Sequence, residues 1–191
     1  MFRLSRVRFS RGITLIEVLV TLLIVAIGLL GLAGLQVTTI SSQFEAYQRA
    51  QSLLLLEDMA NRIRVNAPAA RAGNYPDGDE YGLGIDLEAI PDCTVVTPTA
   101  ARDLCEWSNA IAGAGVLREG QGLGSVIGAR GCIENRAGSA DGELIVRLTI
   151  AWQGAVPTRA PALTCGLDAY GDDDRTRRVV STDVVLAFLG L

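Results

Sequence analysis

Apolar residues are distributed very unevenly along the chain. Residues 13–35 read ITLIEVLVTLLIVAIGLLGLAGL and contain one charged side chain, Glu17. A helix of this length spans a hydrocarbon core about 30 Å thick, so the segment predicts a transmembrane helix. Four arginines and no acidic residue precede it. This asymmetry predicts that the N-terminal end stays in the cytoplasm and that the rest of the chain is exported.

The helical pattern continues beyond Leu35 but becomes amphipathic. Residues 36–66 contain neither Pro nor Gly, and apolar residues recur every three or four positions. We expect this stripe to pack on the rest of the protein. Its members are Ile40, Phe44, Tyr47, Ala50, Leu54, Leu55, Met59 and Ile63. Pro68 should end the helix near Asn66, because the residue before a proline avoids helical geometry.

The remaining sequence predicts a small head with both helix and strand. Residues 67–92 are rich in Gly, Pro, Asp and Ala and predict a loop region. Thr97 can cap a helix that carries Leu104, Trp107 and Ile111 on one face. Three segments alternate or cluster apolar residues as strands do, namely 125–134, 143–152 and 178–188. The predicted fold class is therefore α+β, with a long N-terminal helix on a small antiparallel sheet.

Composition argues against catalysis and nucleic-acid binding. The chain has no His and no Lys, and its 17 basic residues are all Arg. The commonest general base, the Schiff-base amine and the commonest metal ligand are thus missing. The net charge is −4, which disfavours contacts with phosphates. We expect no enzyme activity, no cofactor, no metal and no nucleic-acid partner.

The cysteines favour disulfides over a zinc site. Cys93, Cys105, Cys132 and Cys165 are well separated, with no CxxC motif and no histidine. Disulfides imply an oxidising compartment, in agreement with export. Three pairings are possible. We favour Cys93–Cys105, which closes a short loop against the Trp107 helix, and Cys132–Cys165, which ties the first strand to the connection before the last.

Two other patterns have simpler interpretations. Residues 120–125 resemble a phosphate loop only loosely, because no strand precedes them and no lysine follows. Asp168 and the acidic run 172–174 offer carboxylates for Ca²⁺, but their spacing lacks the alternation of an EF-hand and arginines follow at once. A flexible turn and a solvated loop are the favoured interpretations.

The segment Gly12-Ile13-Thr14-Leu15-Ile16-Glu17-Val18 resembles the class III signal of type IV pilins and type II secretion pseudopilins. The resemblance implies that a prepilin peptidase cuts between Gly12 and Ile13 and that the new N-terminus at Ile13 is methylated. It implies three parts: a cytoplasmic leader (1–12), a hydrophobic then amphipathic pilin helix (13–66), and a periplasmic or extracellular disulfide-containing head (67–191). The family usually begins with Phe or Met, so Ile13 is a departure.

The cut gives Glu17 a partner. The new α-amine at Ile13 is positive at neutral pH, and Glu17 lies four residues further along the same helix. A carboxylate within a membrane segment is costly unless it is paired. We expect Glu17 to accept the amine of a neighbouring subunit and to set the axial register. A Glu17 that only reaches toward the headgroups is the alternative.

Within the pilin-like group the chain is most similar to the minor pilin PilV family. The similarity lies in the apolar helix, in the segment Ala101–Trp107 and in the strand ending Leu148–Trp152. It implies a subunit of the inner membrane, later of the pilus or cell surface, that helps to prime pilus assembly and sits in the tip. Its partners would be other minor pilins, the major pilin, the inner-membrane assembly platform and prepilin peptidase. A GspI-like minor pseudopilin and a tip-displayed adhesin are the alternatives.

Overall fold

We describe a computed structural model, in which residues 12–85, 89–114, 117–118, 121–122 and 126–187 are described. The chain divides into two compact units, with the boundary between Gln43 and Phe44. Helix α1, Leu15–Val65, contributes to both. The units are treated separately below.

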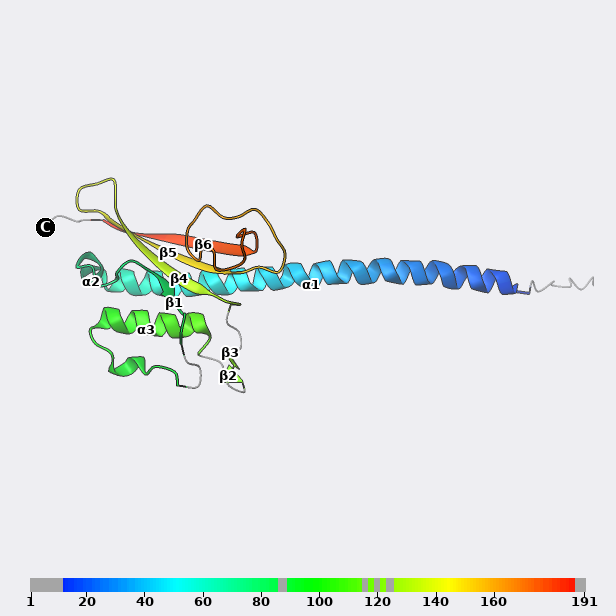
Figure 1. Cartoon of the computed structure of the whole chain (residues 1–191), viewed down its shortest axis with the longest axis horizontal. Coiled ribbons are helices and arrows are strands. Elements are labelled where there is room, and N and C mark those ends of the chain that lie inside the picture. Colours follow the sequence, from blue (N-terminus) through cyan, green and yellow to red (C-terminus); the bar gives the residue numbers. More distant parts are fainter. Residues whose placement is uncertain (1–11, 86–88, 115–116, 119–120, 123–125, 188–191) are drawn as a thin grey trace, which may run out of the picture. The chain divides into compact units, whose positions relative to one another are not determined.

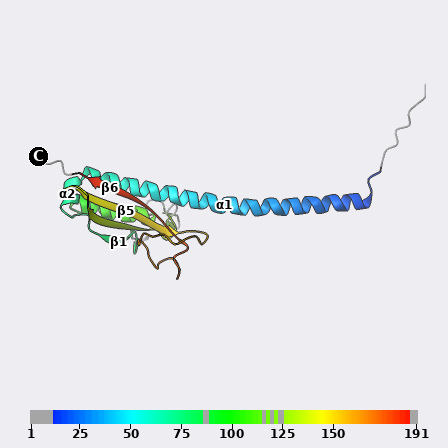
Figure 2. The same cartoon turned by 90° about the horizontal axis from the view of Figure 1, so that it is seen from above.

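The described part of the first unit is the N-terminal portion of α1 and the three residues before it (Figure 2). Almost every side chain from Gly12 to Gln43 is exposed. One helix, α1, is long and apolar enough to cross a membrane by length and composition. Gly28, Gly31 and Gly34 lie within it without interrupting it, and a Cβ added at any of them would meet no atom within 4 Å.

The second unit is built on a four-stranded antiparallel sheet of order β1-β4-β5-β6 (Figure 1). Its strands are β1 (Gly78–Tyr81), β4 (Arg130–Ala137), β5 (Leu144–Gln153) and β6 (Arg177–Leu186). Strands β4 and β5 form a hairpin in which Ala137 faces Leu144, and β5 pairs with β6 over its whole length. A separate two-stranded sheet joins β2 (Leu117–Arg118) to β3 (Gln121–Gly122).

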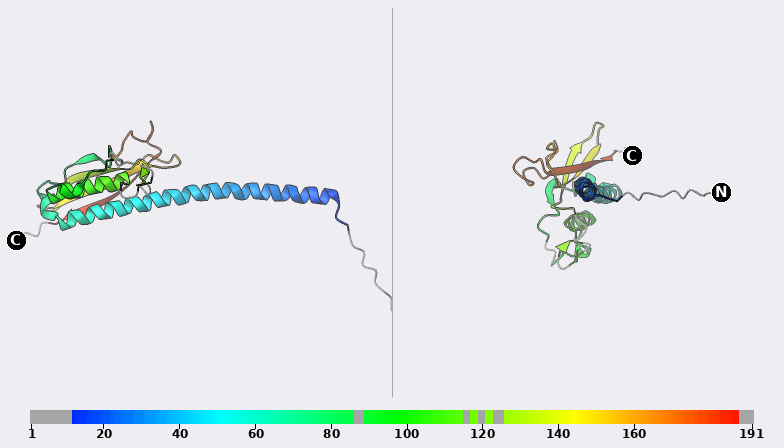
Figure 3. Two further views of the ribbon diagram at one scale, coloured as in Figure 1. Left: turned by 90° about the horizontal axis from the view of Figure 1, so that it is seen from below. Right: turned by 90° about the vertical axis from the view of Figure 1, so that its right-hand side faces the viewer.

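The core lies between the inner face of this sheet, the C-terminal portion of α1 and helix α3, Thr99–Ala112 (Figure 3). Alternation along β5 turns every second residue inward. The inward residues Val146, Leu148 and Ile150 are fully buried, as are Met59 and Ile63 of α1. These side chains form a single cluster with α3.

Helix α3 is positioned by a tryptophan. Trp107 is fully buried, and its Nε1 donates a hydrogen bond to the carbonyl of Leu55 in α1 at 3.0 Å. A Cβ at Gly131 of β4 would lie 2.5 Å from the Trp107 ring, so only glycine admits the ring there. The helix ends at Gly113, whose positive φ of 81° closes it in the left-handed conformation.

The outer face of the sheet is partly covered by residues 154–176, which connect β5 to β6. Cys165 of this connection is bonded to Cys132 of β4. The Tyr170 hydroxyl donates to the carbonyls of Gly128 and Ala151, at 2.6 and 3.1 Å. Arg177 is 1% exposed and donates to the carbonyls of Pro161, Leu163 and Cys165. These contacts hold the connection against the sheet.

The α+β architecture expected from sequence is confirmed, with local differences. Helix α1 ends at Val65, one residue before the predicted end. The expected loop 67–92 contains a short helix, α2 (Ala67–Arg71), and the edge strand β1. Pro68 explains α2, because proline is tolerated in the first turn of a helix. The first predicted strand, 125–134, starts too early, since the backbone turns before β4 begins at Arg130.

Three further expectations concern chain segments near the ends of elements. Helix α3 begins at Thr99 after Pro98, and no side chain caps it, so the cap expected at Thr97 is wrong. The inward residues predicted for the last strand lie on β6, where Val184 and Leu186 are buried. Phe188 lies outside the described residues. So does most of the glycine-rich segment 120–125.

Candidate assembly surface on the N-terminal helix

Helix α1 starts with a hydrogen-bonded cap at Thr14. The Glu17 N–H donates to the Thr14 hydroxyl at 3.3 Å and to the Thr14 carbonyl at 3.1 Å. The spacing Thr14-x-x-Glu17 is that of a capping box. A carboxylate in the first turn is also favoured by the positive end of the helix dipole. Glu17 therefore stabilises the start of the helix, a role that the sequence analysis did not assign to it.

The residues expected to direct leader cleavage and to set the axial register between subunits all lie at the N-terminal end of α1. They are Gly12, Ile13 and Glu17. Gly12 and Ile13 precede α1, and both are exposed. Glu17 follows within the first turn and is exposed as well. An α-amine at Ile13 and the Glu17 carboxylate would thus be presented at the same end of one helix.

The apolar stripe beyond the first unit is turned away from the head, contrary to expectation. Phe44, Tyr47 and Leu54 are 44%, 48% and 60% exposed, and Ile40 and Ala50 are exposed as well. Gln48 and Ser52 are instead turned inward, at 3% and 0%. The prediction that the stripe packs on the head is wrong for Phe44, Tyr47, Ala50 and Leu54, while its last members Met59 and Ile63 are buried. We call Phe44, Tyr47 and Leu54 the outward stripe.

The reason lies in the geometry of the helix. Each residue turns the side chain by about 100°, and the head contacts the face that carries Met59 and Ile63. Counting back from Met59 in steps of three or four gives Leu56, Ser52 and Gln48, all of which are buried. The outward stripe follows the same spacing with a different phase. The buried face becomes polar toward its N-terminal end, and the exposed face stays apolar.

The buried amide of Gln48 is poorly accommodated. Neither Nε2 nor Oε1 has a hydrogen-bond partner within the described residues. The Ser52 hydroxyl donates to the Gln48 backbone carbonyl at 2.9 Å, which leaves the amide itself unmatched. A buried polar group without a partner lowers stability by about 1–3 kcal/mol. The unmatched Gln48 amide therefore reduces the stability that this part of the contact between α1 and the head provides.

A bilayer alone does not cover the outward stripe. About 20 helical residues cross the hydrocarbon core, which accounts for the segment from Ile13 to about Leu32. Phe44 lies about ten residues beyond this segment, and Leu54 lies ten further. Contiguous exposed apolar side chains are typical of surfaces that contact other proteins or membranes, so the outward stripe is a candidate for such contact. A parallel helix with the same spacing of apolar residues would match it.

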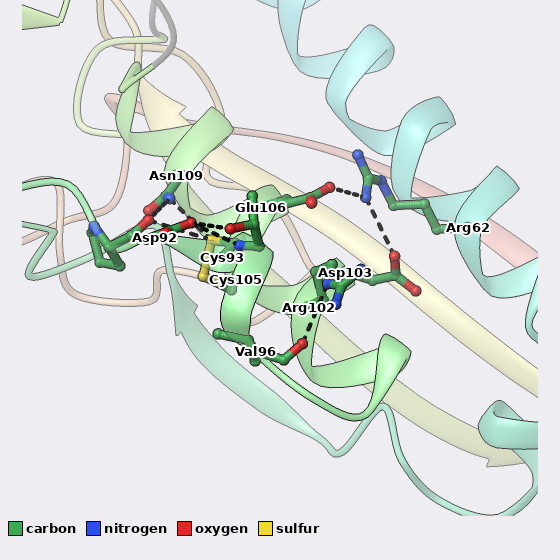
Figure 4. The surroundings of a disulfide bond; sticks show 11 residues. Arg62, Asp92, Cys93, Val96, Arg102, Asp103, Cys105, Glu106 and Asn109 are labelled. Atoms are coloured by element: carbon green, nitrogen blue, oxygen red, sulfur yellow. Dashed lines mark hydrogen bonds and ion pairs between the residues drawn. A yellow bond between two sulfur atoms is a disulfide. The ribbon is translucent and has the colours of Figure 1, made fainter.

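Ion pairs join α1 to the head on the C-terminal side of the outward stripe (Figure 4). Arg62 reaches Glu106 of α3 at 2.5 Å, Asp103 at 3.3 Å and Asp58 of α1 at 2.8 Å. Burial alone would lower the pKa of Arg62, but the three carboxylates outweigh it and raise the pKa above its ordinary value. Arg62 therefore stays charged and joins the two helices.

A tyrosine extends this network into the core. The Tyr75 hydroxyl donates to Asp103 at 2.6 Å and accepts from the Asn66 amide at 3.1 Å. Burial and the bond to Asp103 raise the pKa of Tyr75 to about 12. At the other end of the contact, Glu45 accepts from Arg178 at 3.0 Å and from the Ala155 N–H at 3.2 Å. The C-terminal portion of α1 is thus joined to the rest of the head near both of its ends, through Arg62 and through Glu45.

The cysteines form two disulfides in the structure, Cys93–Cys105 and Cys132–Cys165. This is the pairing that the sequence favoured. The first joins a short 3-10 helix, Cys93–Val95, to α3, close to Arg62 and its partners (Figure 4). The acidic run has a structural partner: Asp174 pairs with Arg177 at 3.1 Å and accepts the Asp168 N–H. Asp174 thus serves to order the connection 154–176.

Comparison with protein-family models gives two matches, both in the N-terminal part of the chain. Residues 7–33 match the prokaryotic N-terminal methylation motif. Residues 34–78 match the family described as type IV pilin Tt1218. Comparison with curated proteins and with solved structures gives no match.

The methylation motif, the long apolar helix and the small antiparallel sheet define the class of the protein, a pilin with a prepilin signal. Within that class, the two matches together support a type IV pilin-like family. Proteins of this family are structural and generally not enzymes. The family implies processing by prepilin peptidase and assembly with other pilins.

Proposed function

We propose that the protein is a minor type IV pilin that helps to prime pilus assembly and then remains in the pilus, at or near its tip. The outward stripe is the observation that carries the proposal. Apolar side chains from Phe44 to Leu54 are exposed beyond the length that a bilayer covers. They lie on the same helix as a prepilin methylation motif. A subunit that packs against parallel helices of other pilins uses such a surface.

The proposal includes the processing of the N-terminus. Residues 1–12 would be a cytoplasmic leader, and cleavage after Gly12 would leave Ile13 as the methylated first residue. The segment 13–66 would anchor the subunit in the inner membrane, with residues 67–191 in the periplasm. Two disulfides fit that compartment. After assembly the protein would lie in the pilus on the cell surface.

Glu17 would direct the entry of the subunit. The Ile13 amine of a neighbouring pilin is positive, and pairing it with the Glu17 carboxylate would reduce the free energy of burying either charge. The Thr14 cap bonds the backbone N–H of Glu17, so the residue that carries the carboxylate lies in the first turn of α1, close to the cleavage site. The position in PilV-like assemblies is supported by the resemblance of the apolar helix and of the segment Ala101–Trp107.

A deletion strain tests the function. We expect the loss of surface pili and twitching, with protein secretion unchanged, and recovery of both when the gene is restored. The alternative, a GspI-like minor pseudopilin, uses the same N-terminal chemistry, and it predicts lost secretion with normal pili. The match to a type IV pilin family over residues 34–78 favours the pilus. A strain with normal pili but impaired attachment would instead point to a tip-displayed adhesin.

Two substitutions separate processing from assembly. Gly12→Val should block leader removal, seen as a precursor of undiminished mass, whereas Gly28→Val within the helix should be cleaved normally. Glu17→Val should be cleaved but recovered poorly in sheared pili. Thr21→Val makes a similar change from polar to apolar one turn further on and is its control. Mature Gly12→Val protein, or normal incorporation of Glu17→Val, would contradict these roles.

A further inference from the structure

The outer face of the sheet bears a cavity that pilus assembly does not explain. Its volume is about 550 Å³, within the range of about 300–1,000 Å³ typical of ligand sites. It opens beside the Cys132–Cys165 disulfide, where the connection 154–176 stops covering the sheet. Carboxylates from Asp77, Asp79 and Glu134 line it. All of these residues belong to the second unit.

The cavity is negatively charged. Its one basic residue, Arg147, forms two hydrogen bonds to Asp183, at 2.8 and 2.9 Å. Asp183 does not line the cavity and also pairs with Arg136 at 3.3 Å, and Glu134 of the cavity wall interacts with Arg147 as well. The hydrogen bond from Arg147 lowers the pKa of Asp183, which keeps that partner ionised. The cavity therefore has three carboxylates and one guanidinium, that of Arg147, which is already paired with Asp183.

Two of these carboxylates have free acceptor capacity. Asp79 makes no side-chain hydrogen bond or ion pair with any described residue. Asp77 uses Oδ1 to accept from the backbone and the side-chain amide of Asn135, each at 2.7 Å, and its second oxygen remains available. Glu134 has a weak ion pair with Arg136 at 3.5 Å. The wall thus offers several acceptors for an incoming donor.

Thr149 provides an independent indication of a ligand. It is 4% exposed and lines the cavity. It faces Cys132 across the β4–β5 pair and so lies on the same outer face of the sheet. Its hydroxyl has no hydrogen-bond partner within the described part of the chain. The hydroxyl oxygen is not one of the fully buried side-chain atoms without a partner, so it is accessible from the cavity and can bond to a polar ligand atom there.

The positions of the carboxylates and apolar side chains around the cavity indicate which class of ligand fits it. Among the described residues no three of His, Cys, Asp or Glu lie close enough together to hold a metal ion. The carboxylates are therefore spread around the cavity, and Leu163 and Leu167 add apolar surface between them. An anion would meet net negative charge. An elongated organic cation has donors for the carboxylates and for Thr149, and a stem for the leucines.

We propose that this cavity binds an alkylammonium group carried on an apolar stem. Two sources share this chemistry, a lysine side chain of a neighbouring protein and a free diamine. The chain itself contains no lysine, so a lysine must come from a different protein. The site and its ligand are independent of the role of the chain in a pilus.

Titration of the full-length protein in detergent micelles tests the proposal. The probes are 1,5-diaminopentane, the N-acetyl methylamide of lysine, and calcium chloride, followed by calorimetry and by NMR shifts at Thr149 and Leu167. We expect both amines to bind at the cavity, more weakly as salt is raised. Tighter binding of the diamine would identify a free polyamine as the ligand, and tighter binding of the lysine derivative would identify a protein side chain.

Matched variants locate the site. Asp79→Asn should weaken amine binding about fivefold, the effect expected for one partly exposed ion pair. Asp141→Asn makes the same change at an exposed turn residue outside the cavity and should leave affinity unchanged. Thr149→Val keeps the side-chain shape and should also weaken binding. An unchanged NMR spectrum away from the cavity shows that each variant is folded.

Several outcomes would overturn the proposal. Amines that shift no cavity resonances, or that bind Asp79→Asn and Thr149→Val as well as the parent, would show that the cavity is not a cation site. Calcium binding at Thr149 and Leu167 in preference to both amines would replace the organic cation with a metal. Binding by acetate but not by amines would assign the site to Arg147 instead.

Discussion

The two portions of α1 show one helix under two different constraints. From Leu15 to Gln43 almost all side chains are exposed, and the sequence is almost uniformly apolar as far as Leu35. From Phe44 to Val65 one face is buried against the head and the opposite face is exposed. In the first portion no other described part of the chain covers the apolar side chains. In the second portion one face of the helix packs on the head, and the opposite face carries the outward stripe.

This contrast explains why the second portion is less regular in its polarity than an amphipathic helix usually is. Around Gln48 the buried side is polar, and around Phe44 and Leu54 the exposed side is apolar. A helix selected only to stabilise its own head would have the reverse arrangement. This arrangement does not favour the stability of the isolated head, and the proposed contacts with other subunits would account for it.

The largest expected effect separates the stability of the two portions. Trp107→Ala removes a fully buried ring and its bond to Leu55 of α1, and it should lower the free energy of unfolding by about 3–5 kcal/mol. Leu30→Ala removes an apolar side chain from the exposed portion and should leave head unfolding unchanged. Urea unfolding followed by near-UV circular dichroism checks both. An equal loss in the two variants would show that the portions unfold as one unit.

The next effect contrasts the two faces of the second portion. Gln48→Leu replaces an unmatched buried amide by an apolar side chain of similar volume, and it should stabilise the head by about 2 kcal/mol. Leu54→Gln changes an exposed side chain and should alter head stability by less than about 0.5 kcal/mol. The same Leu54→Gln variant should be recovered less well in sheared pili.

Thermal unfolding of both variants measures the effect on head stability, and a pilus-shearing assay measures their incorporation into pili. Destabilisation by Gln48→Leu would mean that the amide has a structural partner, such as an ordered water. Normal incorporation of Leu54→Gln would remove the outward stripe from the assembly surface. Glu57→Gln, an exposed substitution on the same helix, is a suitable control for both assays.

How far the sequence predicts the structure follows from the same residues. Long, strongly periodic segments were interpreted correctly: α1 ends within one residue of the expected position, and Val146, Leu148 and Ile150 face inward as alternation requires. The face of α1 that contacts the head was predicted wrongly around Phe44 and Tyr47, because their apolar spacing continues on the exposed side of the helix. Periodicity detects an apolar face, but it does not tell which partner covers that face.

Local features were harder to predict for a different reason. The cap at Thr14 was visible in the spacing Thr14-x-x-Glu17, but the functional interpretation of Glu17 drew attention away from it. The cavity beside Cys132 could not be predicted, because Asp77, Glu134 and Thr149 are brought together by strand register. Such a cluster depends on long-range pairing, which the order of residues in one segment does not contain.

The smallest effect concerns pH and compares a buried tyrosine with an exposed one. The pKa of Tyr75 is raised to about 12 in the folded state, first by burial and then by Asp103, whereas an unfolded tyrosine ionises near pH 10. The folded state therefore holds its proton longer, and this contribution is present below pH 10 and is lost as pH rises from 10 to 12. Burial also raises the pKa values of Tyr81 and Tyr170, which act in the same direction.

Urea unfolding at pH 9 and pH 11 measures this loss. Tyr75→Phe should reduce the difference in unfolding free energy between the two pH values by on the order of 1 kcal/mol, because each unit of pKa difference corresponds to about 1.4 kcal/mol. The loss should not disappear, since Tyr81 and Tyr170 remain. Tyr47→Phe alters a half-exposed ring of the outward stripe and should leave the pH dependence as it is. If Tyr75→Phe behaved like Tyr47→Phe, the hydroxyl of Tyr75 would be neither buried nor bonded to Asp103, and Arg62 would be the remaining side-chain partner of Asp103.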